Sequence, residues 1–147
     1  MRFGMAVLAV ALFAGACGGS DDGGGGGGGA ANKADWDKKY GAIVNSVSDD
    51  IDRSVQALNA GQRPVVLSEC TQLQEDLVEA KKALPVPDST VDGVLRTAFD
   101  ATTTAVNTCV EGARIASDAD KIEEAQAQMK TARDKYDDAQ AAIAGWS

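Results

Sequence analysis

Residues 84–95 read Leu84-Pro-Val-Pro-Asp-Ser-Thr-Val-Asp-Gly-Val-Leu95, and this segment is the clearest guide to the topology of the chain. Its two prolines end any helix that arrives from the N-terminal side, and Asp88 or Ser89 can cap a new one. On both sides of it, apolar residues recur at spacings of three and four, which is the periodicity of an amphipathic helix. Because the connection is short, the two helices must be antiparallel neighbours.

The same periodicity extends outward to two further helices. We expect helices from about Asp35 to Ala60, from Pro64 to Leu84, from about Ser89 to Ala116, and from about Asp118 to Trp146. The apolar stripe of the first runs through Trp36, Tyr40, Ile43, Val47, Ile51, Val55 and Leu58.

The turns between these helices complete the predicted topology. In the first turn, Gly61 lies just past the end of one helix and Pro64 lies in the first turn of the next, which is the order that proteins favour. The residues Ser117 to Asp120 either cap a fourth helix or continue the third as one rod. A change of phase in the apolar stripe, and the preference of Ser and Asp for caps, favour the break. The prediction is an all-α, up-down-up-down antiparallel four-helix bundle.

The N-terminal residues 1–16 have a short basic start, an apolar run and small residues at the end, as in a secretory signal peptide. The end of this segment together with the next residue, Phe13-Ala-Gly-Ala-Cys17, resembles the lipobox of bacterial prolipoproteins. The resemblance implies that Cys17 becomes the acylated first residue of the mature protein. The alternatives are an ordinary secreted protein or a retained anchor, although the apolar run is shorter than the roughly 20 residues that span a bilayer.

Seven consecutive glycines, residues 23–29, follow the expected lipidation site. Glycine runs form flexible coil, and about 17 residues of it reach roughly 20 to 25 Å. The run lacks the Lys-Ser/Thr of a phosphate-binding loop. The expected organisation is therefore a signal peptide (1–16), a lipidated Cys17 with a flexible Gly-rich linker (17–34), and a helical bundle domain (35–147).

Two further cysteines, Cys70 and Cys109, lie on apolar stripes of the second and third helices. Setting them side by side lets the third helix overshoot the second by about 9 Å, which Pro85 to Asp88 can span. In an exported chain with Cys17 acylated, this even pair predicts a disulfide. Two buried free thiols or a redox pair are the alternatives, although no CxxC motif is present.

Both tryptophans fall at one end of the predicted bundle. Trp36 begins the first helix and Trp146 ends the fourth, with Tyr40 and Ile143 one turn further in. The aromatic group is either a foot that touches lipid headgroups or a plug that seals the bundle. A thin, Ala-rich core favours the plug.

The chain contains no histidine, which excludes Ser-His-Asp and Cys-His catalysis, His-ligated haem and the usual zinc sites. Met129 is the only methionine after residue 16, so a Met-rich copper site is excluded as well. We expect no catalytic residue, no cofactor and no metal, and hence a protein that is not an enzyme.

The carboxylates are the remaining candidates for chemistry. They form small clusters: Asp49, Asp50 and Asp52; Glu75, Asp76 and Glu79; Asp134, Asp137 and Asp138. All are expected on solvated faces opposite the apolar stripes. Thr102 lies on a stripe, where its hydroxyl either bonds back to its own helix or lines a small cavity. Without residues 1–16, which carry Arg2, the net charge of −8 becomes −9. This charge disfavours nucleic acid and anionic lipid as partners.

Taken whole, the chain resembles the small, largely uncharacterised lipoproteins of high-GC bacteria, particularly actinobacteria. They share the lipobox at Cys17, a Gly/Ser/Asp linker and an Ala- and Asp-rich helical domain with two cysteines. The resemblance implies export and lipid anchoring to the outer face of the cell membrane, and it implies no activity.

Two classes of function are open. The first is a non-enzymatic interaction module that engages an unknown envelope protein or polymer, held at the membrane through its N-terminal lipid anchor. The second is a carrier for a small apolar or lipid-like ligand in the bundle core. A large apolar surface patch favours the module, and an enclosed apolar cavity favours the carrier.

Overall fold

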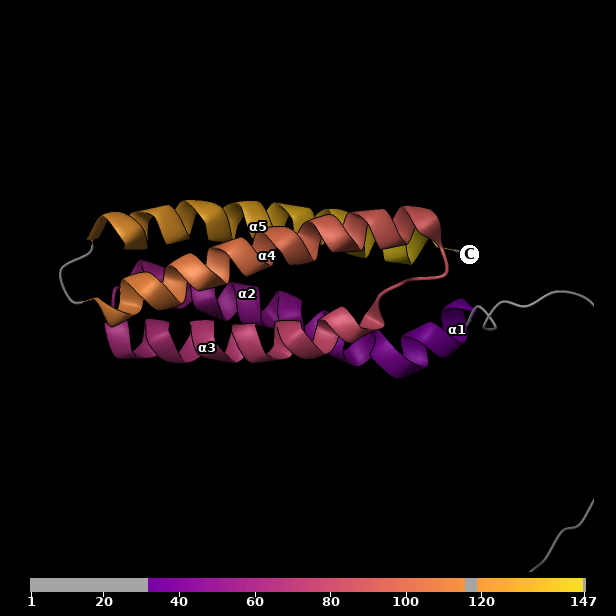
Figure 1. The fold of residues 1–147 in the computed structure, drawn as a ribbon, viewed down its shortest axis with the longest axis horizontal. Coiled ribbons are helices and arrows are strands. Elements are labelled where there is room, and N and C mark those ends of the chain that lie inside the picture. Colours follow the sequence, from indigo (N-terminus) through magenta and orange to yellow (C-terminus); the bar gives the residue numbers. More distant parts are fainter. Residues whose placement is uncertain (1–31, 116–118, 147) are drawn as a thin grey trace, which may run out of the picture.

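Four helical segments run alternately up and down along one axis (Figure 1). The structure, a computed structural model, describes residues 32–115 and 119–146, and these residues contain no strand. The predicted all-α, up-down-up-down bundle is confirmed. The expected signal peptide, the lipidation site Cys17 and the glycine run lie outside the described residues.

The first helical segment consists of α1 (Lys33–Trp36), a π-helical turn (Asp37–Gly41) and α2 (Ala42–Ala60). It begins where the Asn32 side chain accepts a hydrogen bond from the Asp35 amide. The wider π-helical turn shifts the faces of the helix that follow it. Trp36, which precedes the turn, and Val44, which follows it, are both buried, while Tyr40 and Ile43, which the sequence placed on the stripe, are only partly covered.

The second segment is α3 (Arg63–Ala80), extended by a 3₁₀ turn (Lys81–Ala83). Gly61, between α2 and α3, has a φ of 67°, and its amide donates to the carbonyls of Ala57 and Leu58. This left-handed conformation suits glycine because it has no Cβ. Pro64 lies in the first turn of α3, as predicted.

The second hairpin consists of α4 (Ser89–Arg114) and α5 (Ala119–Gly145). The Asp88 carboxylate caps α4 by accepting hydrogen bonds of 2.9 Å from the amides of Thr90 and Val91. Because α4 and α5 lie antiparallel in Figure 1, the predicted break between them is confirmed. The break itself falls on residues 116–118, outside the described part.

The helices form a closed ring in the order α2, α3, α4 and α5, with α5 returning to α2. Each helix therefore has two neighbours and buries a face wider than a single stripe. The largest buried side chains include Trp36, Tyr136, Phe99, Leu73 and Met129. Met129 is fully buried and fills space in this core.

The bundle has two distinct ends. We call the end formed by residues 32–41, 81–97 and 137–146 the base, and the opposite end, with the α2–α3 turn, the tip. The described chain both begins and ends at the base (Figure 1). Within the described residues, no helix combines the length and apolar character that a membrane span requires.

Candidate functional site

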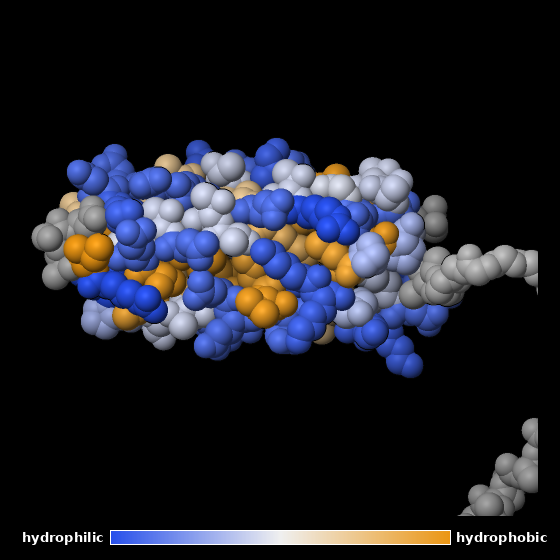
Figure 2. All heavy atoms as spheres, in the orientation of Figure 1, coloured by the Kyte–Doolittle hydropathy of each residue, from blue (hydrophilic) through white to orange (hydrophobic). Residues whose placement is uncertain are grey.

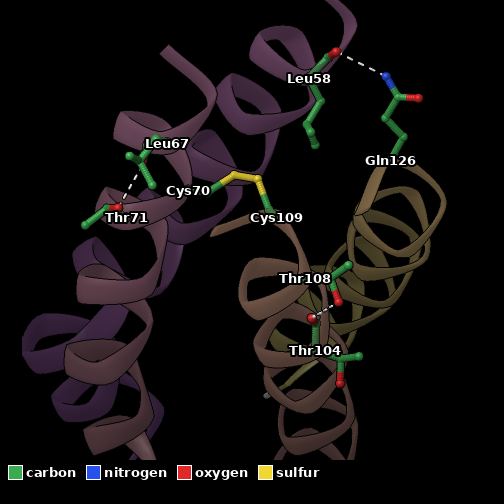
Figure 3. The surroundings of a disulfide bond; sticks show 8 residues. All are labelled: Leu58, Leu67, Cys70, Thr71, Thr104, Thr108, Cys109 and Gln126. Atoms are coloured by element: carbon green, nitrogen blue, oxygen red, sulfur yellow. Dashed lines mark hydrogen bonds between the residues drawn. A yellow bond between two sulfur atoms is a disulfide. The ribbon is translucent and has the colours of Figure 1, made fainter. Parts of the chain in front are cut away.

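Cys70 of α3 and Cys109 of α4 form a disulfide, with their Cα atoms 6.2 Å apart (Figure 3). Both residues are fully buried. On the same seam, Gln74 donates to Asn107 at 3.1 Å and Lys81 donates to Thr103 at 2.7 Å. The predicted pairing and antiparallel register are confirmed, and the two thiols are not free to act as nucleophiles. The third site residue, Cys17, lies outside the described residues.

The two tryptophans meet at the base, as predicted. Their ring centroids lie 5.8 Å apart in an edge-to-face arrangement. The Trp36 indole N–H donates to the carbonyl oxygen of Ala83 at 3.0 Å, and the residue is 2% exposed. Trp146 is only partly covered. Trp36 therefore seals the bundle end, while Trp146 presents part of its surface to solvent.

The polar run of α4 satisfies its own hydroxyls. Thr102 is fully buried and donates to the carbonyl of Ala98 at 2.8 Å. Thr103, Thr104 and Thr108 likewise bond back one turn along the helix. Of the two alternatives for Thr102, the structure shows the local hydrogen bond.

The prediction that all acidic clusters lie on solvated faces is wrong for Asp50. Its side chain is 1% exposed, whereas its neighbour Asp49 is exposed. The cause is the ring topology, because α2 packs against both α3 and α5 and so buries a broad arc. That arc includes Asp50 and Ser54, which are one turn apart on α2.

Only one of the two carboxylate oxygens of the buried Asp50 has a partner in the described part of the chain. Its Oδ1 pairs with the guanidinium of Arg53, which is half exposed and also donates to Glu69 of α3 at 3.3 Å. Its Oδ2 and the Ser54 hydroxyl have no hydrogen-bond partner among the described residues. Arg53 neutralises the buried carboxylate and links α2 to α3. Asp50 is not part of a metal-binding cluster, because the described residues contain no group of three His, Cys, Asp or Glu side chains placed to hold an ion.

The surroundings of Tyr136 and Asp92 shift the pKa values of these two side chains. Burial raises the pKa of the Tyr136 hydroxyl well above its ordinary value of 10. The pKa of Asp92 is lowered, first by its hydrogen bond with Arg96 and also by the Val86 amide, which donates to it at 2.7 Å. Both arrangements are structural: Tyr136 joins α5 to α2, and Asp92 holds the connection before α4.

Two grooves flank α3 in the tip half of the bundle. The α3–α4 groove has a volume of about 350 Å³ and is lined by Gln74, Asn107, Val110, Glu111, Arg114 and Ile115. The α2–α3 groove has a volume of about 330 Å³ and is lined by Arg53, Gln56, Ala57, Ala60, Gln62, Val65 and Glu69. Both are open to solvent and mix apolar side chains with carboxamides and charges.

Exposed apolar side chains accompany these grooves. Val65 and Ile115, each just over 40% exposed, line the α2–α3 and the α3–α4 groove respectively. Val78 of α3 is 59% exposed. Figure 2 shows hydrophobic residues along the line between α3 and α4, interrupted by hydrophilic ones. Sequence reasoning missed these grooves, because they depend on which helices are neighbours.

No known protein family, curated protein or solved structure matches the chain.

Proposed function

We propose that the protein is an exported lipoprotein, anchored through Cys17, whose helical bundle is a non-enzymatic interaction module of the cell envelope. In this proposal the base faces the membrane and the tip faces the partner. The observation that carries the proposal is the placement of the two grooves, which flank α3 in the half of the bundle far from Asn32.

The length of the bundle supports this division of roles. At 1.5 Å per residue, the 27 residues of α5 extend about 40 Å from tip to base. The described chain begins at the base, so any anchor that precedes it joins the bundle there. A partner bound at the tip would then be held about 40 Å further from the membrane than the anchored end.

The character of the grooves favours an interaction surface over a carrier. A carrier for an apolar ligand needs an enclosed cavity of several hundred Å³. The two grooves are instead open, and each includes charged side chains beside one exposed aliphatic residue. Such a mixture is typical of a transient protein interface.

The test is site-specific photocrosslinking in the membranes of the host. A photoreactive amino acid replaces Val65 in one variant and Ile115 in another, and it replaces Lys130 of α5 in the control. We expect one envelope component to crosslink from both groove positions and not from Lys130. Adding Val65→Glu to the variant with the photoreactive residue at position 115 should abolish its crosslink. Equal crosslinking from all three positions, or a lipid that copurifies in stoichiometric amount, would contradict the module.

A further inference from the structure

The excess of acidic residues is unevenly distributed along the bundle. The base carries as many cations as acids: Lys33, Lys38, Lys39, Lys81, Lys82 and Arg96 against Asp35, Asp37, Asp88, Asp92, Asp137 and Asp138. The other described residues carry seven Lys and Arg against thirteen Asp and Glu. The bundle is therefore electrically polar, with its negative charge away from the base.

The lysines of the π-helical turn are the most available cations of the base. Lys38 and Lys39 are exposed, and neither has an ion pair among the described residues. The Lys39 ammonium lies 4.9 Å from the centre of the Tyr40 ring. By contrast, Lys33 pairs with Asp37 at 2.6 Å and Lys82 pairs with Glu79 at the same distance. Two adjacent ammonium groups are thus left to meet an external anion.

Aromatic rings adjoin these lysines. Trp146 packs edge-on against Trp36, and the Lys33 ammonium lies 5.8 Å from the centre of its ring. Tyr40 also packs against Trp36, with a centroid distance of 6.1 Å. Partly exposed Trp and Tyr beside lysines are typical of segments at a membrane–water interface.

We propose that the base docks on anionic lipid headgroups, with Lys38 and Lys39 against the phosphates and Trp146 at the interface. The inference rests on the proposed function in one respect: a lipid at Cys17 would bring the base to the membrane. A short tether gives the base a high effective concentration at the surface, so weak contacts are enough. The net charge of the whole chain led us to expect repulsion from anionic lipid. A net charge does not show that the acidic excess lies away from the base.

Tryptophan fluorescence reports on the base alone, because both tryptophans of the chain lie there. The chain from Cys17 onward, with the Cys70–Cys109 disulfide intact, is coupled through the Cys17 thiol to a maleimide phospholipid in vesicles. The vesicles are phosphatidylcholine, with or without about 30% phosphatidylglycerol as the anionic lipid, and contain a headgroup spin label that quenches tryptophan at short range. Chemical coupling makes this experiment independent of natural acylation.

We expect stronger quenching in the anionic vesicles and its loss at about 1 M salt, where the screening length falls to about 3 Å. Each lysine near an anionic surface is worth about fivefold in the docking equilibrium, so Lys38→Glu/Lys39→Glu should lower docking about 25-fold or more. Lys130→Glu makes the same change in net charge as Lys38→Glu alone, at an exposed position away from the base and outside both grooves, and it should leave the quenching unchanged.

Equal quenching in neutral and anionic vesicles, or equal loss of quenching in Lys38→Glu and Lys130→Glu, would overturn the inference. So would base-directed crosslinking to a protein in host membranes together with no lipid-dependent quenching, because the base would then be a protein interface. Absence of natural acylation at Cys17 would contradict the proposed function and leave the vesicle result standing.

Discussion

The hydroxyl of Tyr136 in α5 donates a hydrogen bond of 2.6 Å to the carbonyl oxygen of Val44 in α2. This bond closes the helical ring between two residues that are 92 positions apart in the sequence. Tyr136 is fully buried and its ring also contacts Phe99 of α4. We expect Tyr136→Phe to lower the free energy of unfolding at neutral pH by about 1 kcal/mol, measured by urea denaturation.

The buried hydroxyl of Tyr136 should also make the free energy of unfolding fall at alkaline pH. Burial raises the pKa of Tyr136 in the folded state, so above pH 10 the unfolded chain loses this proton first. The unfolded state is thereby favoured, and stability falls by about 1.4 kcal/mol per pH unit from this group. Tyr136→Phe should flatten the fall above about pH 10. An equally steep fall in the parent and in Tyr136→Phe would contradict the assignment.

Replacing each of two glycines of α4 by alanine should change the stability of the bundle in opposite directions. A Cβ on Gly112 would lie 3.1 Å from the Cβ of Lys121 and 3.3 Å from the Lys121 backbone, so α5 would have to move away. We expect Gly112→Ala to destabilise the bundle by about 1 to 2 kcal/mol. A Cβ on Gly93 would meet nothing within 4 Å, so Gly93→Ala should stabilise by about 0.5 to 1 kcal/mol. Thermal unfolding of the two variants measures both effects, and equal shifts would show that α4 and α5 do not approach closely.

The pair of Asp50 and Arg53 predicts an asymmetric double-mutant cycle. Removing the guanidinium leaves a buried, unpaired carboxylate, whereas removing the carboxylate leaves a half-exposed cation that still contacts Glu69. Because Arg53 is half exposed, Arg53→Ala should cost about 1 to 2 kcal/mol, less than the loss of a fully buried partner. Asp50→Asn should cost less, and in a chain that already carries Asp50→Asn the effect of Arg53→Ala should nearly disappear. Additive effects would show that the two side chains do not interact.

The Cys70–Cys109 disulfide closes a loop with a sequence separation of 39. On the chain-entropy account, its removal should lower the free energy of unfolding by about 4 kcal/mol. Guanidinium denaturation of the Cys70→Ala/Cys109→Ala variant, compared with the parent, measures this loss. Adding a reductant should destabilise the parent by a similar amount and leave the variant unchanged.

The sequence predicted the parts of the fold that depend on local signals. Gly61 and Asp88 mark helix ends by backbone geometry and capping, and the cysteine register follows from the length of the Pro85–Asp88 connection. The burial of Asp50 could not be read from spacing, because it depends on α2 having neighbours on two sides. The π-helical turn likewise has no periodic signal, yet it moves Tyr40 to the margin of the core.

The candidate surfaces depend even more on the tertiary arrangement. Val65 and Ile115 are 50 residues apart in the sequence, and each acquires a groove only when α3 lies between α2 and α4. The charge polarity of the bundle also appears only once the ends of four helices are assigned to the base or the tip. Composition reports the sum of the charges and not where they lie.

We propose that the protein is a disulfide-bonded bundle tethered to a membrane through Cys17. Intact-mass analysis of the mature protein from its native membrane, with and without reduction, is the decisive experiment. We expect a chain that begins at a diacylglyceryl-modified Cys17 and gains two daltons on reduction. An unmodified chain released into the medium would contradict it, and the carrier alternative would then become the leading hypothesis.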